Sequence, residues 1–189
     1  MTVDGALDDA VHDAVHDAVL DAAYGACAAD IGTEVIASLI EHGFTIAVAE
    51  SLTGGLLVAE LIRVPGASST VVGGVVAYNT ALKHSVLGVD ASLLTDNGPV
   101  HPEVARQMAD RVRTALAVNG VPADIGVSTT GVAGPGPQDG HPAGTVYLGF
   151  AIGEDVSSLK LELGGDRAAI REKTVSEALI RLKNALESR

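Results

Sequence analysis

The chain has 189 residues with 12 Lys plus Arg and 24 Asp plus Glu, which gives a formal net charge of −12. Such an acidic chain lacks the basic face of a general nucleic-acid binder, and no apolar run reaches the roughly 20 residues that cross a bilayer. Without a signal-peptide pattern and with a single cysteine, Cys27, it is expected to be soluble and cytoplasmic, with no nucleic-acid or membrane partner.

The first 30 residues differ in pattern from the rest. Residues 10–21 carry a near-repeat of Ala-Val-His/Leu-Asp, which predicts a helical N-terminal extension, 1–30, ahead of one domain at 31–189. His12 and His16 stand one helical turn apart, but no third metal ligand is evident nearby, so we predict no metal site. A homo-oligomer, specifically a dimer, is expected.

From residue 31 onward, helical and strand patterns alternate. The expected elements in chain order are a helix at 31–42, a strand at 45–49, a helix ending near 63, a loop at 65–69, a strand at 71–77, a short helix containing residue 83, a helix from 101 to 119, a strand at 124–128, a loop at 131–140, strands at 144–152 and 156–163, and a helix starting after 166. This alternation predicts an α/β fold: a three-layer α/β/α sandwich with a mixed, mostly parallel sheet and one antiparallel hairpin strand.

The stretch Ala49–Gly55 joins a predicted strand to a helix through a sharp polar turn. A serine here, Ser51, can stand at the sheet edge beside free N–H groups and attack a carbonyl while those groups hold the oxyanion. Alternatively, Ser51 or Thr53 is only a helix cap. Ser51, Tyr78 and Thr130 all lie at or near predicted strand ends, where ligands of such sheets bind, and this favours a site.

A nucleophilic serine needs a base. The candidate histidines are not singled out by any arrangement with an Asp; they are His42, His84, His101 and His141. Lys83, five residues after Tyr78, is the other candidate, because a Ser–Lys pair is a known variant of acyl-transfer catalysis. Its amine must then be neutral, with its pKa lowered by burial or a nearby cation. Otherwise Tyr78 is a core residue and Lys83 a surface one.

The loop at 131–140 is rich in glycine and proline. It can present N–H groups to a phosphate, although it is neither a P-loop nor a Rossmann fingerprint, and an ordinary surface loop is the alternative. Arg167, at the start of the last helix, can pair with a phosphate or carboxylate or can be solvated.

Seven ordered motifs resemble the CinA C-terminal-domain family, which includes the PncC-type nicotinamide-mononucleotide amidohydrolases, and they cover residues 31–187. They are Ala49–Gly55, Gly73–Tyr78 with Lys83, Leu87–Val89, Gly98–Val100, Thr130–Pro135, Gly144–Val146, and Gly165–Arg167 with Arg171.

The resemblance implies hydrolysis of the carboxamide of nicotinamide mononucleotide (NMN), a small-molecule nucleotide, to nicotinate mononucleotide and ammonia, without metal or organic cofactor. It implies that Ser51 is the nucleophile, Lys83 its base and Tyr78 a group that orients or relays protons, with backbone amides from Leu52 to Gly54 as the oxyanion hole. Glu50 would either tune Lys83 or satisfy backbone donors. The implied substrate-binding residues are Thr53, Gly54, Thr130, Gly131 and Arg167, with Arg171 a weaker candidate.

The sequence departs from the family pattern at two positions near these motifs. Leu52 stands where many members have Cys, and His141 stands where characterised deamidases have a lysine near the end of the Gly-rich segment. Two alternatives therefore stay open, namely a catalytically weak nucleotide-binding module and an amidase for a related carboxamide. The large N-terminal domain of fused members has no counterpart here, so no pyrophosphatase activity is expected.

Overall fold

A computed structural model of the chain describes residues 30–189. The predicted helical extension at 1–30, apart from its last residue, and the His12/His16 pair lie outside the described residues. No helix within residues 30–189 combines the length and the apolar character that a membrane span requires.

A five-stranded sheet forms the middle of the domain, in the order β2-β1-β3-β4-β5. β1 pairs in parallel with β2 and β3, whereas β3–β4 and β4–β5 are antiparallel. The strands are β1 (Ile46–Glu50), β2 (Val71–Val76), β3 (Ile125–Gly131), β4 (Thr145–Ile152) and β5 (Asp155–Glu162). Only β4 runs against the others, as the sequence pattern predicts.

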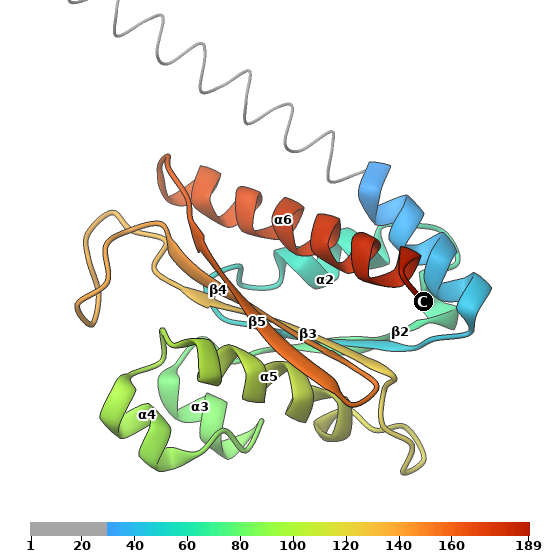
Figure 1. Ribbon diagram of the computed structural model, residues 1–189, viewed down its shortest axis with the longest axis horizontal. Coiled ribbons are helices and arrows are strands. Elements are labelled where there is room, and N and C mark those ends of the chain that lie inside the picture. Colours follow the sequence, from blue (N-terminus) through green and yellow to red (C-terminus); the bar gives the residue numbers. More distant parts are fainter. Residues whose placement is uncertain (1–29) are drawn as a thin grey trace, which may run out of the picture.

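Helices cover both faces of this sheet (Figure 1). One layer holds the helical residues 30–42 with α2 (Leu56–Ile62) and α6 (Arg167–Glu187), and the opposite layer holds α3 (Thr80–Ser85), α4 (Ala91–Asn97) and α5 (Pro102–Ala115). Aliphatic side chains and alanine fill both interfaces, with Val48 and Leu179 in one core and Ala49 and Val104 in the other. The prediction of a three-layer α/β/α sandwich is confirmed.

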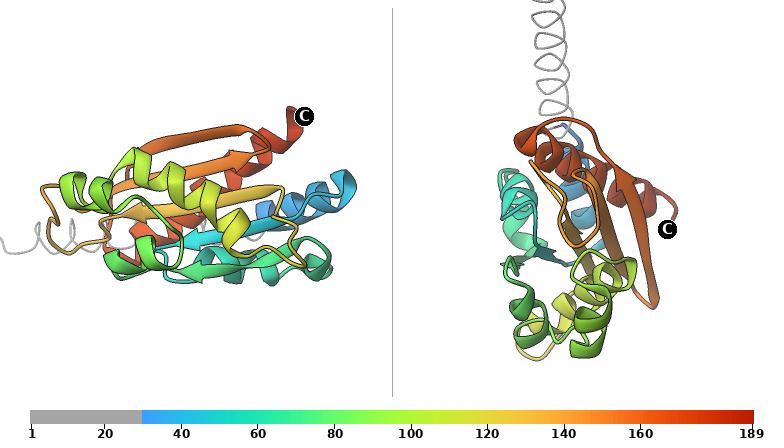
Figure 2. Two further views of the ribbon diagram at one scale, coloured as in Figure 1. Left: turned by 90° about the horizontal axis from the view of Figure 1, so that it is seen from below. Right: turned by 90° about the vertical axis from the view of Figure 1, so that its left-hand side faces the viewer.

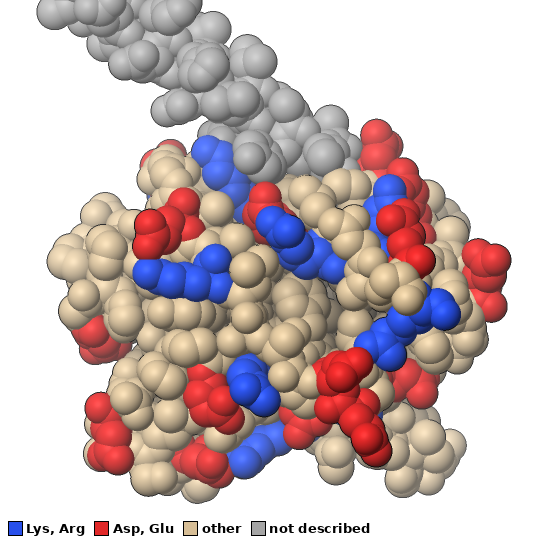
Figure 3. Space-filling view, viewed as in Figure 1, with Lys and Arg blue, Asp and Glu red and all other residues tan. Residues whose placement is uncertain are grey.

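β1 lies between both helical layers, and all five of its residues are buried. A strand covered on both faces carries a continuous apolar run, and Ile46 to Ala49 fit that rule. Glu50 breaks the run at the carboxyl end of the strand, where the first polar cluster of the interior begins. On the outer surface, basic and acidic side chains alternate over the face drawn in Figure 3.

The elements differ from the sequence expectations at three places. α4 (Ala91–Asn97) was not expected; it has seven residues and buries none of them, so it has no amphipathic pattern. α5 ends at Ala115 rather than near 119, because Val118 and Val121 pair across a tight turn. β3 continues to Gly131, because pairing with β4 recruits the residues expected to open the loop.

α5 packs against one face of the sheet (Figure 2), and glycines of β3 and β4 lie at this contact. A Cβ at Gly126 of β3 would lie 1.8 Å from the carbonyl oxygen of Ala109, and one at Gly149 of β4 would lie 2.2 Å from that of Ala105. Both neighbours are backbone atoms, which cannot turn aside as a flexible side chain can. The close approach therefore requires glycine at both positions.

Replacing Gly126 by Ala is expected to lower the free energy of unfolding by at least about 1–3 kcal/mol, because α5 must move away from β3. Urea unfolding measures this change. Gly164→Ala is the matched control, since a Cβ there meets nothing within 4 Å, and its effect should stay within about 0.5 kcal/mol. Equal stability of the two variants would contradict the close approach.

Candidate active site

A cavity of about 110 Å³ opens at the carboxyl ends of β1 and β3. Six of the eight residues predicted for the site line it, and they come from segments far apart in the sequence: Ser51, Tyr78, Lys83, Thr130, Gly131 and Arg167. The remaining lining residues, which the sequence did not indicate as site residues, are Leu52, Thr80, Pro99, Val100, Ala133 and Gln138. Pro99 and Val100 belong to the motif Gly98–Val100, and this motif is the feature of the sequence that could have indicated them as site residues.

Ser51 and Lys83 form a buried pair at the floor of this cavity. The Lys83 Nζ atom lies 2.9 Å from Ser51 Oγ and donates a hydrogen bond to the carbonyl oxygen of Ala77 at 2.8 Å. Lys83 is 1% exposed and Ser51 is 8% exposed. The lysine reaches this position from α3, a helix that starts at Asn79, whose side chain accepts the amide hydrogen of Ala81.

Burial lowers the pKa of Lys83 to about 8, because a charged amine loses its hydration in the interior. About a tenth of the amine is therefore neutral at pH 7, far more than for an ordinary lysine, and its lone pair can accept the hydroxyl proton of Ser51. This is the requirement that a lysine must meet to act as a general base.

Glu50 is fully buried next to Ser51, and its carboxylate faces the start of α2. Its two oxygens accept hydrogen bonds from the amides of Gly55, Leu57 and Val58, at 2.8 to 3.1 Å. These amides are among those that a helix start leaves unpaired, and a negative charge is favoured there. Of the two roles considered for Glu50, the structure supports the one that satisfies backbone donors.

The turn after Ser51 contains amides in two different situations. The Ser51 amide donates to the carbonyl oxygen of Thr129 at 3.0 Å, and the Gly54 amide donates back to that of Ser51 at 3.2 Å. Within residues 30–189, the amides of Leu52 and Thr53 have no hydrogen-bond acceptor. Leu52 lines the cavity, so its N–H is left to bind a developing oxyanion, whereas Thr53 is fully buried and does not line the cavity.

Thr53 and Gly54 do not line the cavity. The Thr53 hydroxyl is buried and lies 2.7 Å from that of Thr129, so its side chain connects β1 to β3 in the interior. Gly54 adopts φ +62°, the left-handed conformation that favours glycine in a tight turn. Thr53 and Gly54 therefore contribute to the shape of the turn and not to the cavity lining.

Arg167 connects two walls at the mouth of the cavity. Its guanidinium donates to the Tyr78 hydroxyl at 3.0 Å and to the carbonyl oxygen of Gly134 at 2.8 Å. Tyr78 is 60% exposed, so it stands at the rim and not on the floor. Deeper in the wall, the Thr130 hydroxyl donates to the carbonyl oxygen of Pro99 at 2.7 Å.

The loop between β3 and β4 brings an amide side chain to the cavity and no cation. Gln138 and His141 exchange two backbone hydrogen bonds across a turn in which Asp139 and Gly140 both have positive φ. Gln138 lines the cavity, whereas His141 does not. Among residues 30–189, Arg167 and Lys83 are the only basic residues in the lining.

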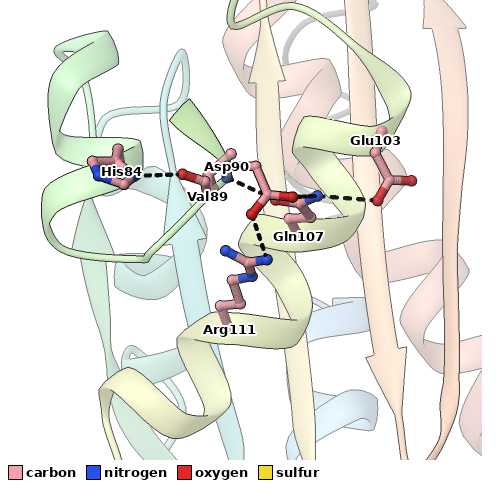
Figure 4. Close-up of polar contacts among 6 residues, drawn as sticks. All are labelled: His84, Val89, Asp90, Glu103, Gln107 and Arg111. Atoms are coloured by element: carbon pink, nitrogen blue, oxygen red, sulfur yellow. Dashed lines mark hydrogen bonds and ion pairs between the residues drawn. The ribbon is translucent and has the colours of Figure 1, made fainter. Parts of the chain in front are cut away.

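The candidate histidines have other contacts, and none within residues 30–189 lines the cavity. Figure 4 shows His84 bonded to the carbonyl oxygen of Val89, next to Asp90, which contacts Gln107 and Arg111 of α5. This network fastens the segment before α4 to α5 and is structural. The described part of the chain holds no group of three His, Cys, Asp or Glu residues that could bind a metal.

Comparisons with known proteins agree on one family. The family described as the CinA C-terminal domain matches residues 28–186. A Geobacillus kaustophilus protein named as competence-damage inducible is 47% identical over 152 residues, which is 80% of this chain and 36% of that protein. The chain thus spans about a third of the length of this relative.

Solved structures of similar proteins share the fold. A CinA superfamily protein of Klebsiella pneumoniae has a TM-score of 0.80 at 29% identity, covering 86% of this chain and 99% of that one. A competence/damage inducible protein of Agrobacterium tumefaciens has a TM-score of 0.78 at 32% identity, covering 85% and 96%.

Replacing the buried Lys83 by Met should change how stability depends on pH. The folded-state pKa of about 8 lies below the ordinary 10.5, so between these values the unfolded chain binds more protons and stability rises with pH. Wild type should therefore gain about 2–3 kcal/mol relative to Lys83→Met between pH 7 and 10, as urea unfolding at each pH can measure.

Lys160→Met is the control for this experiment. Its exposed amine is paired with Glu162, which raises the pKa of Lys160, so it titrates above this window. A pH dependence that is the same in wild type and in Lys83→Met would contradict a lowered pKa.

Proposed function

The chain belongs to the CinA C-terminal domain family, and we propose that it hydrolyses the carboxamide of NMN to nicotinate mononucleotide and ammonia. The observation that carries this proposal is the buried Lys83 amine, 2.9 Å from Ser51 Oγ with a pKa of about 8. A serine beside a neutral amine is an activated nucleophile for acyl transfer.

In the first half of the reaction, Ser51 Oγ attacks the carboxamide carbon while Lys83 takes the hydroxyl proton. The carbonyl oxygen becomes an oxyanion, which the amide of Leu52 in the cavity lining is available to bind. When the tetrahedral intermediate collapses, the C–N bond breaks, and the proton held by Lys83 passes to the leaving nitrogen. Ammonia departs and an acyl ester on Ser51 remains.

In the second half, water replaces ammonia. Lys83 accepts a proton from the water as its oxygen attacks the ester carbon, and the same amide binds the second oxyanion. Collapse returns the proton to Ser51 Oγ and releases the carboxylic acid. Every proton transfer therefore uses the Ser51–Lys83 pair, and no external acid is required.

The position of the catalytic pair supports one orientation of the substrate. Ser51 and Lys83 are buried parts of the cavity lining, whereas Tyr78 and Arg167 are exposed. With the carboxamide at Ser51, the ribosyl phosphate would extend to the mouth, where Arg167 and Tyr78 lie. A guanidinium is suited to bind phosphate there.

One observation favours a second candidate, an amidase for a related carboxamide that has no phosphate. The loop contributes the neutral Gln138 to the lining, so Arg167 is the one permanently charged group there. A phosphate dianion would have a single strong partner. A substrate panel that includes the riboside and free nicotinamide separates the two candidates.

Wild-type protein should release ammonia from NMN, and Ser51→Ala should reduce kcat by at least about 10⁴-fold, because Ser51 Oγ is the hydroxyl that is hydrogen-bonded to Lys83 Nζ. An enzyme-coupled ammonia assay with chromatography of the nicotinate product measures this. Ser69→Ala is the control and should keep wild-type kcat, because Ser69 is an exposed serine outside the cavity lining.

The assay also distinguishes the alternatives. Thermal stabilisation by NMN without ammonia release would support a nucleotide-binding module and contradict the amidase. Release of ammonia from the riboside but not from NMN would support the second candidate.

Replacing Arg167 by Ala should raise KM for NMN about 10- to 100-fold, since a hydrogen-bonded charge pair with the phosphate is lost. The riboside, which lacks that phosphate, should show a much smaller change. Steady-state kinetics with both substrates measure this difference. An equal loss for both substrates would contradict phosphate binding by Arg167.

A further inference from the structure

Arg171 is held against the turn that follows Ser51, although it lies 119 residues away from Leu52 in the sequence. Its Nε atom donates to the carbonyl oxygen of Leu52 and its Nη2 atom to that of Thr53, both at 2.9 Å. Arg171 does not line the cavity. Its guanidinium therefore acts on the backbone of the turn and not on a ligand.

These two bonds fix the direction of the peptide groups in the turn. The Leu52 carbonyl and the Thr53 amide belong to one peptide unit, which is planar and trans, so the N–H points opposite to the C=O. Because Arg171 holds this carbonyl on one side, the Thr53 N–H is directed to the other. The Thr53 carbonyl and the Gly54 amide are fixed in the same way, and that amide bonds to Ser51.

A cation on these carbonyls also polarises the peptide units. A hydrogen bond to a carbonyl oxygen strengthens the N–H of the same unit as a donor, and the effect is larger in a partly buried site. Arg171 is partly buried, and its planar fork suits two neighbouring carbonyl oxygens, which a lysine cannot match. Glu50 holds the later amides of the same segment, so charges of opposite sign hold this backbone at two points.

We propose that Arg171 is a positioning residue that orients and polarises the oxyanion-binding amide of Leu52. This inference rests on the proposed serine mechanism. Arg171 acts through the Thr53 carbonyl: the Gly54 amide of that peptide unit donates to the Ser51 carbonyl, whose own peptide unit carries the Leu52 N–H. Arg167, by contrast, lines the cavity.

The test compares Arg171→Ala and Arg171→Lys with Arg181→Ala, an exposed arginine of the same helix that is paired with Glu177. Two rates are measured for each: ammonia release from NMN, and labelling of Ser51 by an alkyl fluorophosphonate. In the labelling reaction Ser51 Oγ bonds to phosphorus, fluoride leaves and Lys83 takes the proton. The phosphoryl oxygen then occupies the oxyanion position, so this readout is independent of the true substrate.

Arg171→Ala should lower kcat and the labelling rate together, by about 10- to 100-fold, with KM within about threefold of wild type. Arg171→Lys should fall between, and Arg181→Ala should match wild type. The pH midpoint of labelling, set by Lys83, should stay unchanged, which a general disruption of the site would not allow. Added methylguanidinium should restore part of the rate of Arg171→Ala.

A folded Arg171→Ala that labels at the wild-type rate, or that changes only KM, would overturn the inference. If Arg171→Ala does not fold, the Arg171→Lys variant decides by the same criteria. Wild type that labels at Ser51 but leaves NMN intact would refute the proposed substrate and leave the inference standing. Wild type that is not labelled at all would overturn both.

Discussion

Burying the Lys83 amine beside Ser51 has a cost in free energy, and the arrangement around both residues reflects it. A charged amine in the interior loses hydration that one carbonyl oxygen, that of Ala77, replaces only in part. The charged form is therefore less favourable than in water, which is why the pKa falls to about 8. Stability is thus reduced at the position where a base is available, a trade-off common at functional sites.

Two charged side chains that do not line the cavity, those of Glu50 and Arg171, hold the backbone after Ser51. Glu50 binds the amides at the start of α2, and Arg171 binds the carbonyls of the preceding turn. Each charge is satisfied by several backbone groups, which is how a buried charge becomes tolerable. Among residues 30–189, the amide of Leu52, which lines the cavity, has no acceptor. A rigid donor that needs no reorganisation is what oxyanion stabilisation requires.

The sequence predicts those parts of the fold that depend on neighbouring residues. The strand–turn–helix around Ser51 is local, so apolar runs and glycines indicate it directly. The Ser51–Lys83 contact joins residues 32 apart, and spacing alone left several bases open until the family resemblance selected one. The fork of Arg171 on Leu52 and the close approach of α5 to Gly126 are tertiary features with no periodic signal. α4 buries no residue and left no pattern to detect.

The two ends of the cavity depend on different parts of the chain, and this bears on how the substrate can vary. β1, α3 and the turn that Arg171 contacts hold Ser51, Lys83 and the Leu52 amide. Gln138 lies in a loop that is held by its own backbone hydrogen bonds, between Gln138 and His141. Substitutions in that loop can therefore change which group meets the mouth without moving the Ser51–Lys83 pair. Loops on a rigid scaffold commonly carry specificity in this way. His141, in place of the lysine of the family pattern, is one such substitution, and it leaves the Ser51–Lys83 pair as it is.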